Sequence, residues 1–473
     1  MPSSHGALEH PSLRRQLRLR DLVLTQVLCV VGSSWVGIAA GLGRAQAVTW
    51  MAAMAVFYLP MAASVIYLNR SMPLEGGLYV WARRAFGNFV GFLVAWNLWV
   101  YAIAVTATIL YAVPTELSYL IGPSAAWLPE SRMASLGIVF VIVLTIAVAA
   151  VRGLDVGKWI HNIGGISMLM VFGALILLPA WARVQHAPIH WEPLPMHLPR
   201  TDLFSLALFG QMIFGALCGL EYIAILAGES RSPGRAIGQS VVIASPIICL
   251  MFILGTSSVI AFARGRVDLI APIPQTLRLA LGSRGMGGVV AIAAIALLQL
   301  RLIGAASFLF TGATRLSMTA GWDQLLPGWF TRLHPRWQTP TNSIVFTAVL
   351  ILVTVLLATV GVHAQEAFQV LSNASICHYE LTYVAMFLVP LVGARGLRDA
   401  LPGWLRWTSA VGLGATVFAF VISAYPFVEV VNAWAYAVKI LGTTAVSNVV
   451  AVVFYTVRQR RALGTVEQAS VTG

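Results

Sequence analysis

The sequence predicts an all-α integral membrane protein with about twelve transmembrane helices. Three observations lead to this fold class. Of the 473 residues, 59% are hydrophobic and only 10% are charged, whereas soluble domains carry about 25% charged residues. Apolar segments of roughly 20 residues follow one another along the chain, each long enough to cross a bilayer. Two of these segments are interrupted in the middle by small residues.

The expected spans follow directly from the apolar segments, whose boundaries are defined to within a few residues. They lie at about 22–43, 47–69, 89–121, 134–151, 159–181, 203–227, 237–263, 286–318, 341–361, 367–391, 404–424 and 430–457.

The basic residues determine the expected orientation of the chain. The net charge of +13 is spread over short segments between the spans, which argues against a nucleic-acid patch. With the N-terminus inside, 20 of the 30 Lys and Arg residues fall in cytoplasmic segments and 8 in outer segments. The positive-inside rule therefore places both termini in the cytoplasm, with the spans in the plasma or inner membrane of the cell.

Three polar segments are expected outside the bilayer. The segment from Arg183 to Asp202 reads as a solvated outer loop, because the spacing of its histidines matches no metal-ligand motif. The segment 264–284 is amphiphilic and is expected as an outer loop that packs over the vestibule. The tail after Arg461 is polar and is expected to be disordered.

The two interrupted segments are the most informative feature of the sequence. The first reads Gly32-Ser33-Ser34-Trp35-Val36-Gly37, and the second reads Gly215-Ala216-Leu217-Cys218-Gly219, with Glu221 close behind. Lipid offers no partners to backbone N–H and C=O groups, so a broken helix is tolerated where these groups line a cavity. In transporters built from inverted repeats, such breaks point to the binding site. The alternative interpretation is that these glycines allow close packing between helices.

A pair of broken helices suits a solute that carries opposite charges. A helix that restarts exposes free N–H groups, which bind a carboxylate, whereas a helix that stops exposes carbonyl oxygens, which bind an ammonium group. The two breaks together would therefore form a site for an α-amino acid.

Three motifs resemble the amino acid–polyamine–organocation (APC) superfamily. Residues 73–87, read as PLEGGLYVWARRAFG, resemble its segment between spans 2 and 3. Gly219-Leu220-Glu221 with the stretch 228–233 resembles its span 6 and the following loop. The stretches 314–316, 323–327 and 339–340 resemble the end of its span 8 and the start of span 9. The resemblance covers roughly residues 20–455.

The resemblance implies a LeuT-like fold of five plus five inverted-repeat helices, with discontinuous helices 1 and 6. The first repeat would cover 22–181, the second 203–391 and two further spans 404–457, between cytoplasmic tails at 1–21 and 458–473. It also implies a secondary active transporter that works by alternating access around a site formed by spans 1, 3, 6, 8 and 10.

Carried over onto this sequence, the resemblance assigns roles to both breaks. Gly32, Ser33 and Ser34 would present N–H groups to a substrate carboxylate, and carbonyls near Phe214, Gly215 and Leu217 would receive its ammonium group.

The sequence departs from the superfamily at three places. Ser34 replaces the second glycine of the usual first break, and Gly215 stands where arginine/agmatine-type exchangers have a gating tryptophan. Ser167 or Met168 stands where several proton-coupled members carry a span-5 lysine. Sodium coupling, exchange and another proton carrier therefore all stay open, and no cofactor other than H+ or Na+ is implied.

Charged groups inside spans are functional candidates, because each is costly in lipid. Arg301 would be either the counter-ion of Glu221 or a ligand for an acidic group of the substrate. Glu221 resembles a superfamily position associated with gating or proton response. His378 would titrate near neutral pH as a coupling residue, or serve as a hydrogen-bonded structural residue. Glu116 lies closer to the end of a span, where snorkelling explains it.

Five further residues complete the candidate site. Trp35 lies inside the first break and would form a wall of the pocket. Asn97 and Tyr101 are one turn apart on span 3 and would either face the pocket or pack against neighbours. Gly37 and Gly219 close the two glycine-rich breaks.

These observations favour a transporter over an enzyme or a sensor. The sequence contains no His-Glu-x-x-His motif and no P-loop, and its tails are too short for a signalling domain. An α-amino acid is favoured over a polyamine or another organic amine, because Arg301 would repel a polycation. The expected partners are this solute and the bilayer, and the protein is expected to be a monomer or a homodimer.

Overall fold

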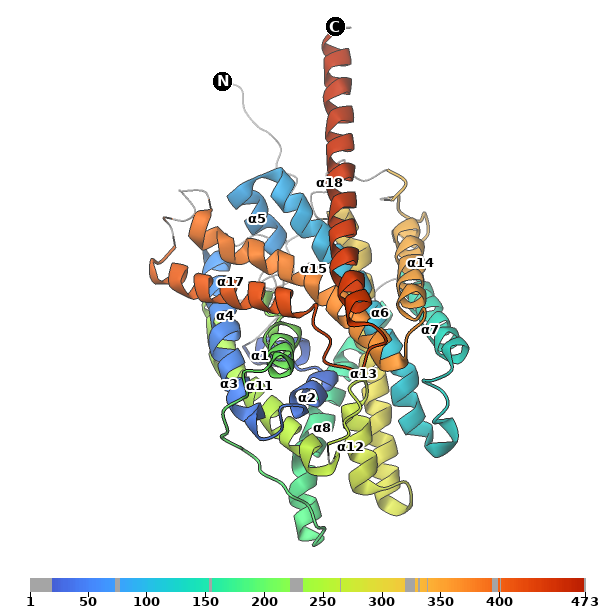
Figure 1. The fold of residues 1–473 in the computed structure, drawn as a ribbon. Coiled ribbons are helices and arrows are strands. Elements are labelled where there is room, and N and C mark those ends of the chain that lie inside the picture. Colours follow the sequence, from blue (N-terminus) through green and yellow to red (C-terminus); the bar gives the residue numbers. More distant parts are fainter. Residues whose placement is uncertain are drawn as a thin grey trace.

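The chain forms a bundle of helices, and the part of it described here contains no strand (Figure 1). A computed structural model describes residues 19–72, 77–152, 155–221, 233–263, 265–319, 328–330, 332–337, 339–393, 399 and 401–471. Most of the predicted N-terminal tail and the motif stretches 73–76, 228–232 and 323–327 lie outside these residues.

Ten helices of the described residues are long and apolar enough to cross a membrane. They lie at Gly43–Ser71, Asn88–Ile121, Arg132–Arg152, Ile166–Val184, Gly238–Ala263, Gly285–Thr314, Thr341–Ala358, Ala364–Val392, Trp404–Ile422 and Ala433–Arg460. The prediction of an all-α membrane protein is thereby confirmed. The two expected spans that do not appear among the ten are those with the interruptions.

The first half of the chain contains long helices and several short ones. The elements are α1 (Leu19–Val30), α2 (Ser33–Ala40), η1 (Gly43–Ala45), α3 (Gln46–Ala53), η2 (Met54–Tyr58), α4 (Leu59–Ser71), α5 (Leu78–Phe86), α6 (Asn88–Ile121), η3 (Pro123–Ala125), α7 (Arg132–Arg152) and α8 (Asp155–Val184). The wide π-helical turn η2 lies just before Pro60, which has no N–H to donate to a normal helical turn.

The second half repeats this mixture of long and short elements. They are α9 (Leu203–Gly210), η4 (Gln211–Ala216), α11 (Pro233–Ala263), α12 (Pro272–Leu281), α13 (Gly285–Thr319), α14 (Thr341–Ala358), α15 (Ala364–Val392), α17 (Trp404–Ile422) and α18 (Ala433–Val471). Helix α12 lies within the segment that was expected as a loop, and it buries Ile273 and Leu277 against the bundle.

The expectation of a disordered C-terminal tail is wrong. Helix α18 continues to Val471, well beyond the apolar part that ends near Arg460. Polarity alone predicted disorder, but a helix that is already nucleated by an apolar span gains one hydrogen bond for each added residue.

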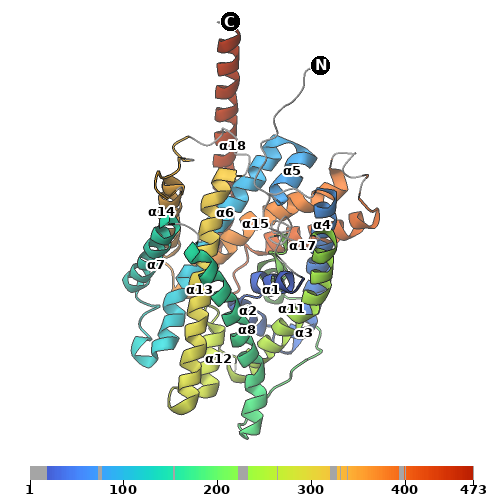
Figure 2. The ribbon, with the colours of Figure 1, turned by 180° about the vertical axis from the view of Figure 1, so that it is seen from behind.

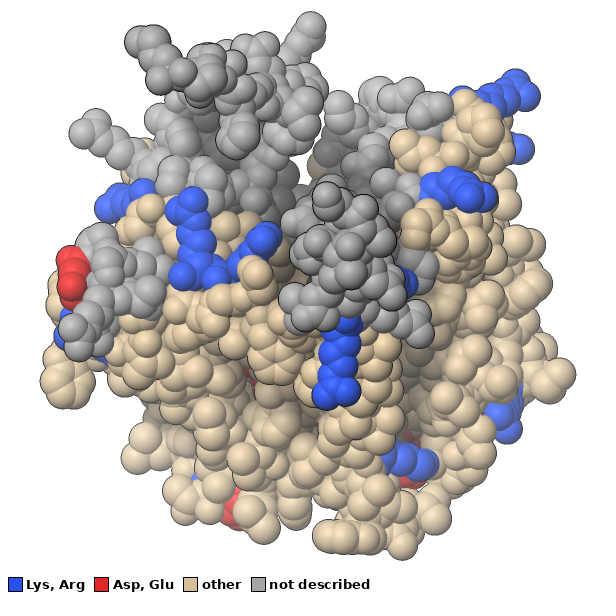
Figure 3. Space-filling model, turned by 90° about the horizontal axis from the view of Figure 1, so that it is seen from above, with Lys and Arg blue, Asp and Glu red and all other residues tan. Residues whose placement is uncertain are grey.

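The upper end of the bundle carries basic side chains around its rim. Helix α5 and the end of α18 lie at the upper end, whereas α12 and the α8–α9 connection lie at the lower end (Figures 1 and 2). Seen from above, Lys and Arg side chains are distributed around the rim, and few acidic side chains are visible (Figure 3). Helix α5 and the end of α18, at this upper end, belong to segments that were predicted to be cytoplasmic.

The short helices α1 and α2 lie inside the bundle, among the longer helices (Figures 1 and 2). Helix α1 packs on α11, and α2 packs on α11, α12 and η4. Helix α6 packs on both α13 and α15. Two short broken elements are therefore enclosed by a frame of long helices.

Helices α1 and α3 are joined to α11 by polar contacts. Gln26 Nε2 donates to Ser240 Oγ at 2.6 Å, and Gln46 Nε2 donates to Ser257 Oγ at 3.0 Å. The Trp50 indole donates to Thr256 Oγ1 at 3.2 Å. These bonds bury amide and indole groups that would otherwise lack partners in lipid.

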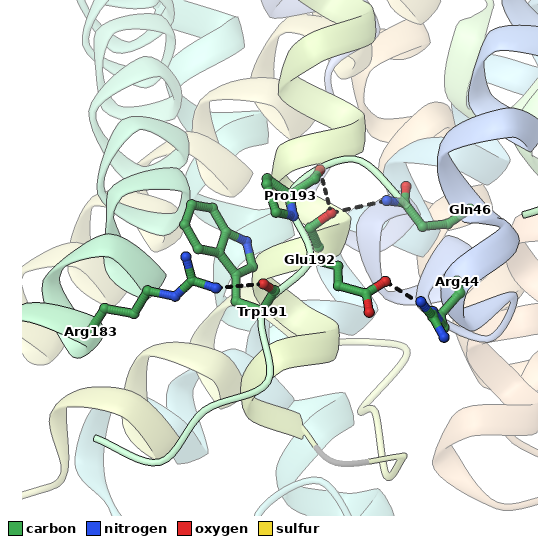
Figure 4. A network of polar contacts seen from close by, with 7 residues as sticks. Arg44, Gln46, Arg183, Trp191, Glu192 and Pro193 are labelled. Atoms are coloured by element: carbon green, nitrogen blue, oxygen red, sulfur yellow. Dashed lines mark hydrogen bonds and ion pairs between the residues drawn. The ribbon is translucent and has the colours of Figure 1, made fainter. Parts of the chain in front are cut away.

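The α8–α9 connection contacts α11 and η1 (Figure 4). The Pro193 carbonyl accepts a hydrogen bond from Ser257 Oγ at 2.9 Å, and Arg183 donates to the Trp191 carbonyl at 2.8 Å. The Arg44–Glu192 ion pair, at 2.9 Å, is largely exposed and contributes about 0–1 kcal/mol.

Close packing between α15 and α17 gives a test of the fold. A Cβ atom at Gly412 would lie 2.4 Å from the buried ring of Phe387, whereas nothing lies within 4 Å of one at Gly414. We expect Gly412→Ala to lower stability by about 1–3 kcal/mol through overpacking. The measurement is the apparent melting temperature of the purified protein in detergent. The matched control, Gly414→Ala, should keep the wild-type value, and equal values for both variants would contradict this packing.

Candidate functional site

The first interruption separates α1 from α2. Helix α1 ends at Val30, Gly32 is extended (φ −107°, ψ 147°), and α2 begins at Ser33. No side chain caps the N-terminus of α2. The N–H groups of its first turn therefore have no partner within the helix, and together they form a positive dipole end.

The second interruption follows η4. Here the chain leaves the π-helical turn at Ala216, and the Cys218 N–H donates to the Phe214 carbonyl at 3.3 Å. Gly219 has a φ of +105°, a conformation that glycine adopts without steric cost. A side chain at Gly219 would strain this turn, which gives one reason for a glycine here.

A cavity of about 240 Å³ lies between the two interruptions. Its volume is slightly below the range of about 300–1,000 Å³ for pockets that bind drug-sized ligands, which suits a small solute. Of the sequence-predicted site residues, the structure brings eight together around it: Gly32, Ser33, Ser34, Trp35, Tyr101, Gly215, Gly219 and Arg301.

The Trp35 side chain connects the two interruptions. A Cβ atom at Gly32 would lie 2.6 Å from the Cδ1 and Nε1 atoms of its indole. A Cβ atom at Gly215 would lie 2.5 Å from Cη2 and 2.7 Å from Cζ3 of the same ring. The indole therefore extends from its own interruption to the opposite one, and it touches glycine at both edges.

Arg301 brings a positive charge to the cavity. No other described residue that lines this space is charged. The Nη2 atom of Arg301 donates to the Val31 carbonyl at 3.1 Å. It thereby satisfies a carbonyl at the end of α1 that the helix cannot pair. The charge of Arg301 also acts on the Glu116 carboxyl group.

Glu116 corrects one interpretation of the sequence. Its side chain is fully buried and accepts a 3.5 Å contact from Gln299 Nε2, so it does not snorkel to the membrane surface. The sequence placed it near the end of a span, but α13 packs over this part of α6 and covers it.

Glu221 is also buried, and it lies behind the cavity wall rather than in it. Tyr383 of α15 donates its hydroxyl hydrogen to Glu221 Oε2, and the Gly219 N–H donates to Tyr383 Oη at 3.1 Å. One tyrosine hydroxyl thus connects an unpaired N–H group of the second interruption to the acidic side chain. The pairing of Glu221 with Arg301 stays a prediction.

Three predicted site residues lie outside the cavity. Asn97 exchanges hydrogen bonds with Asn448 of α18, at 2.7 and 3.1 Å. His378 is buried, with its Nδ1 2.7 Å from the Ala374 carbonyl. A Cβ atom at Gly37 would lie 2.7 Å from Pro272, so this glycine allows α12 to approach.

The remaining two residues form the core behind the second interruption. Phe214 is fully buried and packs edge-on against Tyr379 and Tyr383, with ring centroids 5.7 and 4.9 Å away. Leu217 is likewise fully buried. Neither side chain reaches the cavity.

Sequence reasoning missed several lining residues. They come from α6, α13 and α15 and include Val105, Thr108, Ile109, Ala112, Leu302, Ala305, Phe308, Phe368, Ser372, Ser375 and Ile376. On α6, these residues follow Tyr101 at helical spacing, so the periodicity of that helix contained the signal.

A family model described as "Amino acid permease" matches residues 22–446. The branched-chain amino acid permease BcaP of Bacillus subtilis is 26% identical over 351 residues, which cover 70% of this chain and 72% of the relative.

Two further relatives have other named solutes. The methylthioribose transporter of Bacillus subtilis is 24% identical over 447 residues, covering 86% of this chain and 93% of the relative. The probable agmatine/putrescine antiporter AguD of Lactococcus lactis is 22% identical over 380 residues, covering 79% and 78%.

Ten membrane-capable helices among the described residues define a multi-pass membrane protein. The chain belongs to the amino acid permease family, within the APC superfamily, as its motifs predicted. It is a transporter and not an enzyme.

The hydroxyl of Tyr383 can be tested separately from its ring. We expect Tyr383→Phe to lower stability by about 1–3 kcal/mol and to reduce transport, because buried polar groups of Gly219 and Glu221 lose their partner. Thermal unfolding and solute uptake measure the two effects. Tyr379, one turn earlier on α15, has a buried hydroxyl with no hydrogen-bond partner among the described residues, so Tyr379→Phe is the control. Equal loss in both variants would attribute the effect to general packing.

Proposed function

We propose that this protein moves an α-amino acid across the cell membrane by alternating access. The ten long helices and the two interrupted segments give twelve spans in this proposal, with discontinuous spans 1 and 6. The first inverted repeat covers 22–181, the second 203–391, and two further spans 404–457. Both termini lie in the cytoplasm, which the distribution of Lys and Arg supports.

The observation that carries this proposal is that the N-terminus of α2 lies at the cavity. Its uncapped N-terminus, formed by Gly32, Ser33 and Ser34, lines the same space as Arg301. The free N–H groups favour the α-carboxylate of the substrate, and the guanidinium group favours a second anionic group on it. The substrate carboxylate is therefore placed at the start of α2.

The ammonium group is placed at the opposite interruption. Helical carbonyls at the end of η4, near Gly215 and Leu217, carry the negative end of the helix dipole. The Gly215 carbonyl receives a weak contact from the Cys218 thiol at 3.8 Å, which leaves capacity for a stronger donor. The rest of the cavity wall is mostly apolar and would surround the substrate side chain.

A polyamine or another organic amine is the second candidate substrate. The likeness to an agmatine/putrescine antiporter favours it. However, no carboxylate side chain lines the cavity among the described residues, and Arg301 does. A polycation would meet repulsion from Arg301 there, so the amino acid is preferred.

Solute uptake tests this function. Purified protein in proteoliposomes should take up at least one of the twenty amino acids, and agmatine and putrescine should compete weakly. Repeating the assay with and without sodium, and with and without a pH gradient, separates sodium coupling, proton coupling and exchange. Binding without flux would make the protein a sensor, and preferential uptake of the amines would reverse the substrate assignment.

The role of Arg301 is tested by its removal. We expect Arg301→Ala to abolish uptake of glutamate and aspartate while uptake of neutral amino acids persists, because the guanidinium group is the cation that faces the cavity. Competition for uptake across all twenty amino acids is the measurement. An equal loss for every substrate would show instead that Arg301 acts through its bond to the Val31 carbonyl.

A further inference from the structure

Trp35 occupies a notch that two glycines create. Its indole runs between Gly32 and Gly215, and any side chain at either position would overlap with the ring at 2.5–2.6 Å. These glycines belong to different interruptions, 183 positions apart in the chain. The two interruptions are therefore matched to one aromatic side chain.

We propose that Trp35 is a specificity-determining residue, whose indole sets the upper size limit of the substrate side chain. This proposal rests on the function proposed above. It adds that the site selects substrates by the size of their side chain.

The position of the ring supports this role. Trp35 lines the cavity together with apolar residues such as Ile109, Phe308 and Phe368. Tryptophan is large and has two rotatable side-chain bonds, so a held indole forms a stiff wall. Contact with glycine at both edges opposes movement of the ring toward either interruption. The space left for a solute therefore depends on where this ring rests.

Two substitutions would change the size of the cavity in opposite directions. Shortening Trp35 removes the ring and enlarges the cavity toward Gly215. Adding a methyl group at Gly215 pushes the ring into the cavity, because the new Cβ would lie 2.5 Å from Cη2. The next neighbour of that Cβ is the flexible end of Ile376 at 3.0 Å, which yields more easily than the ring. Without the indole, a methyl group at Gly215 is consequently tolerated.

The experiment compares Trp35→Ala, Gly215→Ala and the double variant in proteoliposomes. Its readout is the ratio of uptake of large side chains (phenylalanine, tryptophan) to small ones (glycine, alanine). We expect Trp35→Ala to raise this ratio by about tenfold or more, since pocket contacts of one or a few carbon groups discriminate by at least that much. Gly215→Ala should lower it, and the double variant should regain uptake that Gly215→Ala has lost.

Gly37→Ala is the matched control. Its Cβ would lie 2.7 Å from Pro272, a clash of similar severity on the same helix as Trp35 but outside the cavity. Its defect should not be relieved by Trp35→Ala, and it should leave the ratio of large to small substrates unchanged. Trp35→Phe serves if Trp35→Ala does not fold, and it should shift the ratio in the same direction by less.

The outcomes separate this inference from the proposed function. Uptake by the wild type with an unchanged ratio in the Trp35 variants overturns the size limit and leaves the transport of amino acids intact. Additive losses in the double variant likewise overturn it, because independent sites add and contacting sites do not. Absence of amino acid uptake by the wild type overturns the proposed function, and the size limit falls with it.

Discussion

Inside a membrane, a chain that leaves the helical conformation must find partners for its own backbone, because lipid supplies none. The arrangement around both interruptions follows from this constraint. Arg301 pairs the Val31 carbonyl, Tyr383 pairs the Gly219 N–H, and the Phe214 carbonyl accepts from Cys218. The first turn of α2 has no side-chain cap, and it borders the cavity. In the proposed function, the solute carboxylate supplies the partner for the N–H groups of this turn.

The sequence predicted the class of fold well, because apolar length and local glycine content are properties of single segments. The same reasoning located both interruptions, since glycine pairs within an apolar segment weaken a helix wherever it packs. It could not predict contacts between residues that are far apart in the chain. Tyr383, which contacts Gly219 and Glu221, is more than 160 positions away from both of them. Nothing in the local pattern marks it among the twelve tyrosines.

Asn97 and Tyr101 show a second limit of the sequence. They are one turn apart on α6, yet Asn97 meets Asn448 of α18, whereas Tyr101 lines the cavity and stacks on Tyr379. The helical period predicts which residues share a face of a helix. Which neighbour each of these residues contacts depends on the helix that packs against that turn. Relatives at 22–26% identity with different named solutes are consistent with this view, because side chains around one architecture decide what is bound.

The polar contacts between α1, α3 and α11 have a mechanical consequence. Interhelical hydrogen bonds in membranes contribute about 0.6 kcal/mol each on average, and at least three of them act in parallel here, beside the stacked rings of Trp50 and Phe252 at 4.2 Å. Separating these helices would break all of these contacts together. Under alternating access, α1, α3 and α11 would therefore move together as one rigid unit. The hydrogen bond from Arg301 to the Val31 carbonyl then connects this unit to α13, and it must break whenever the unit moves away from α13.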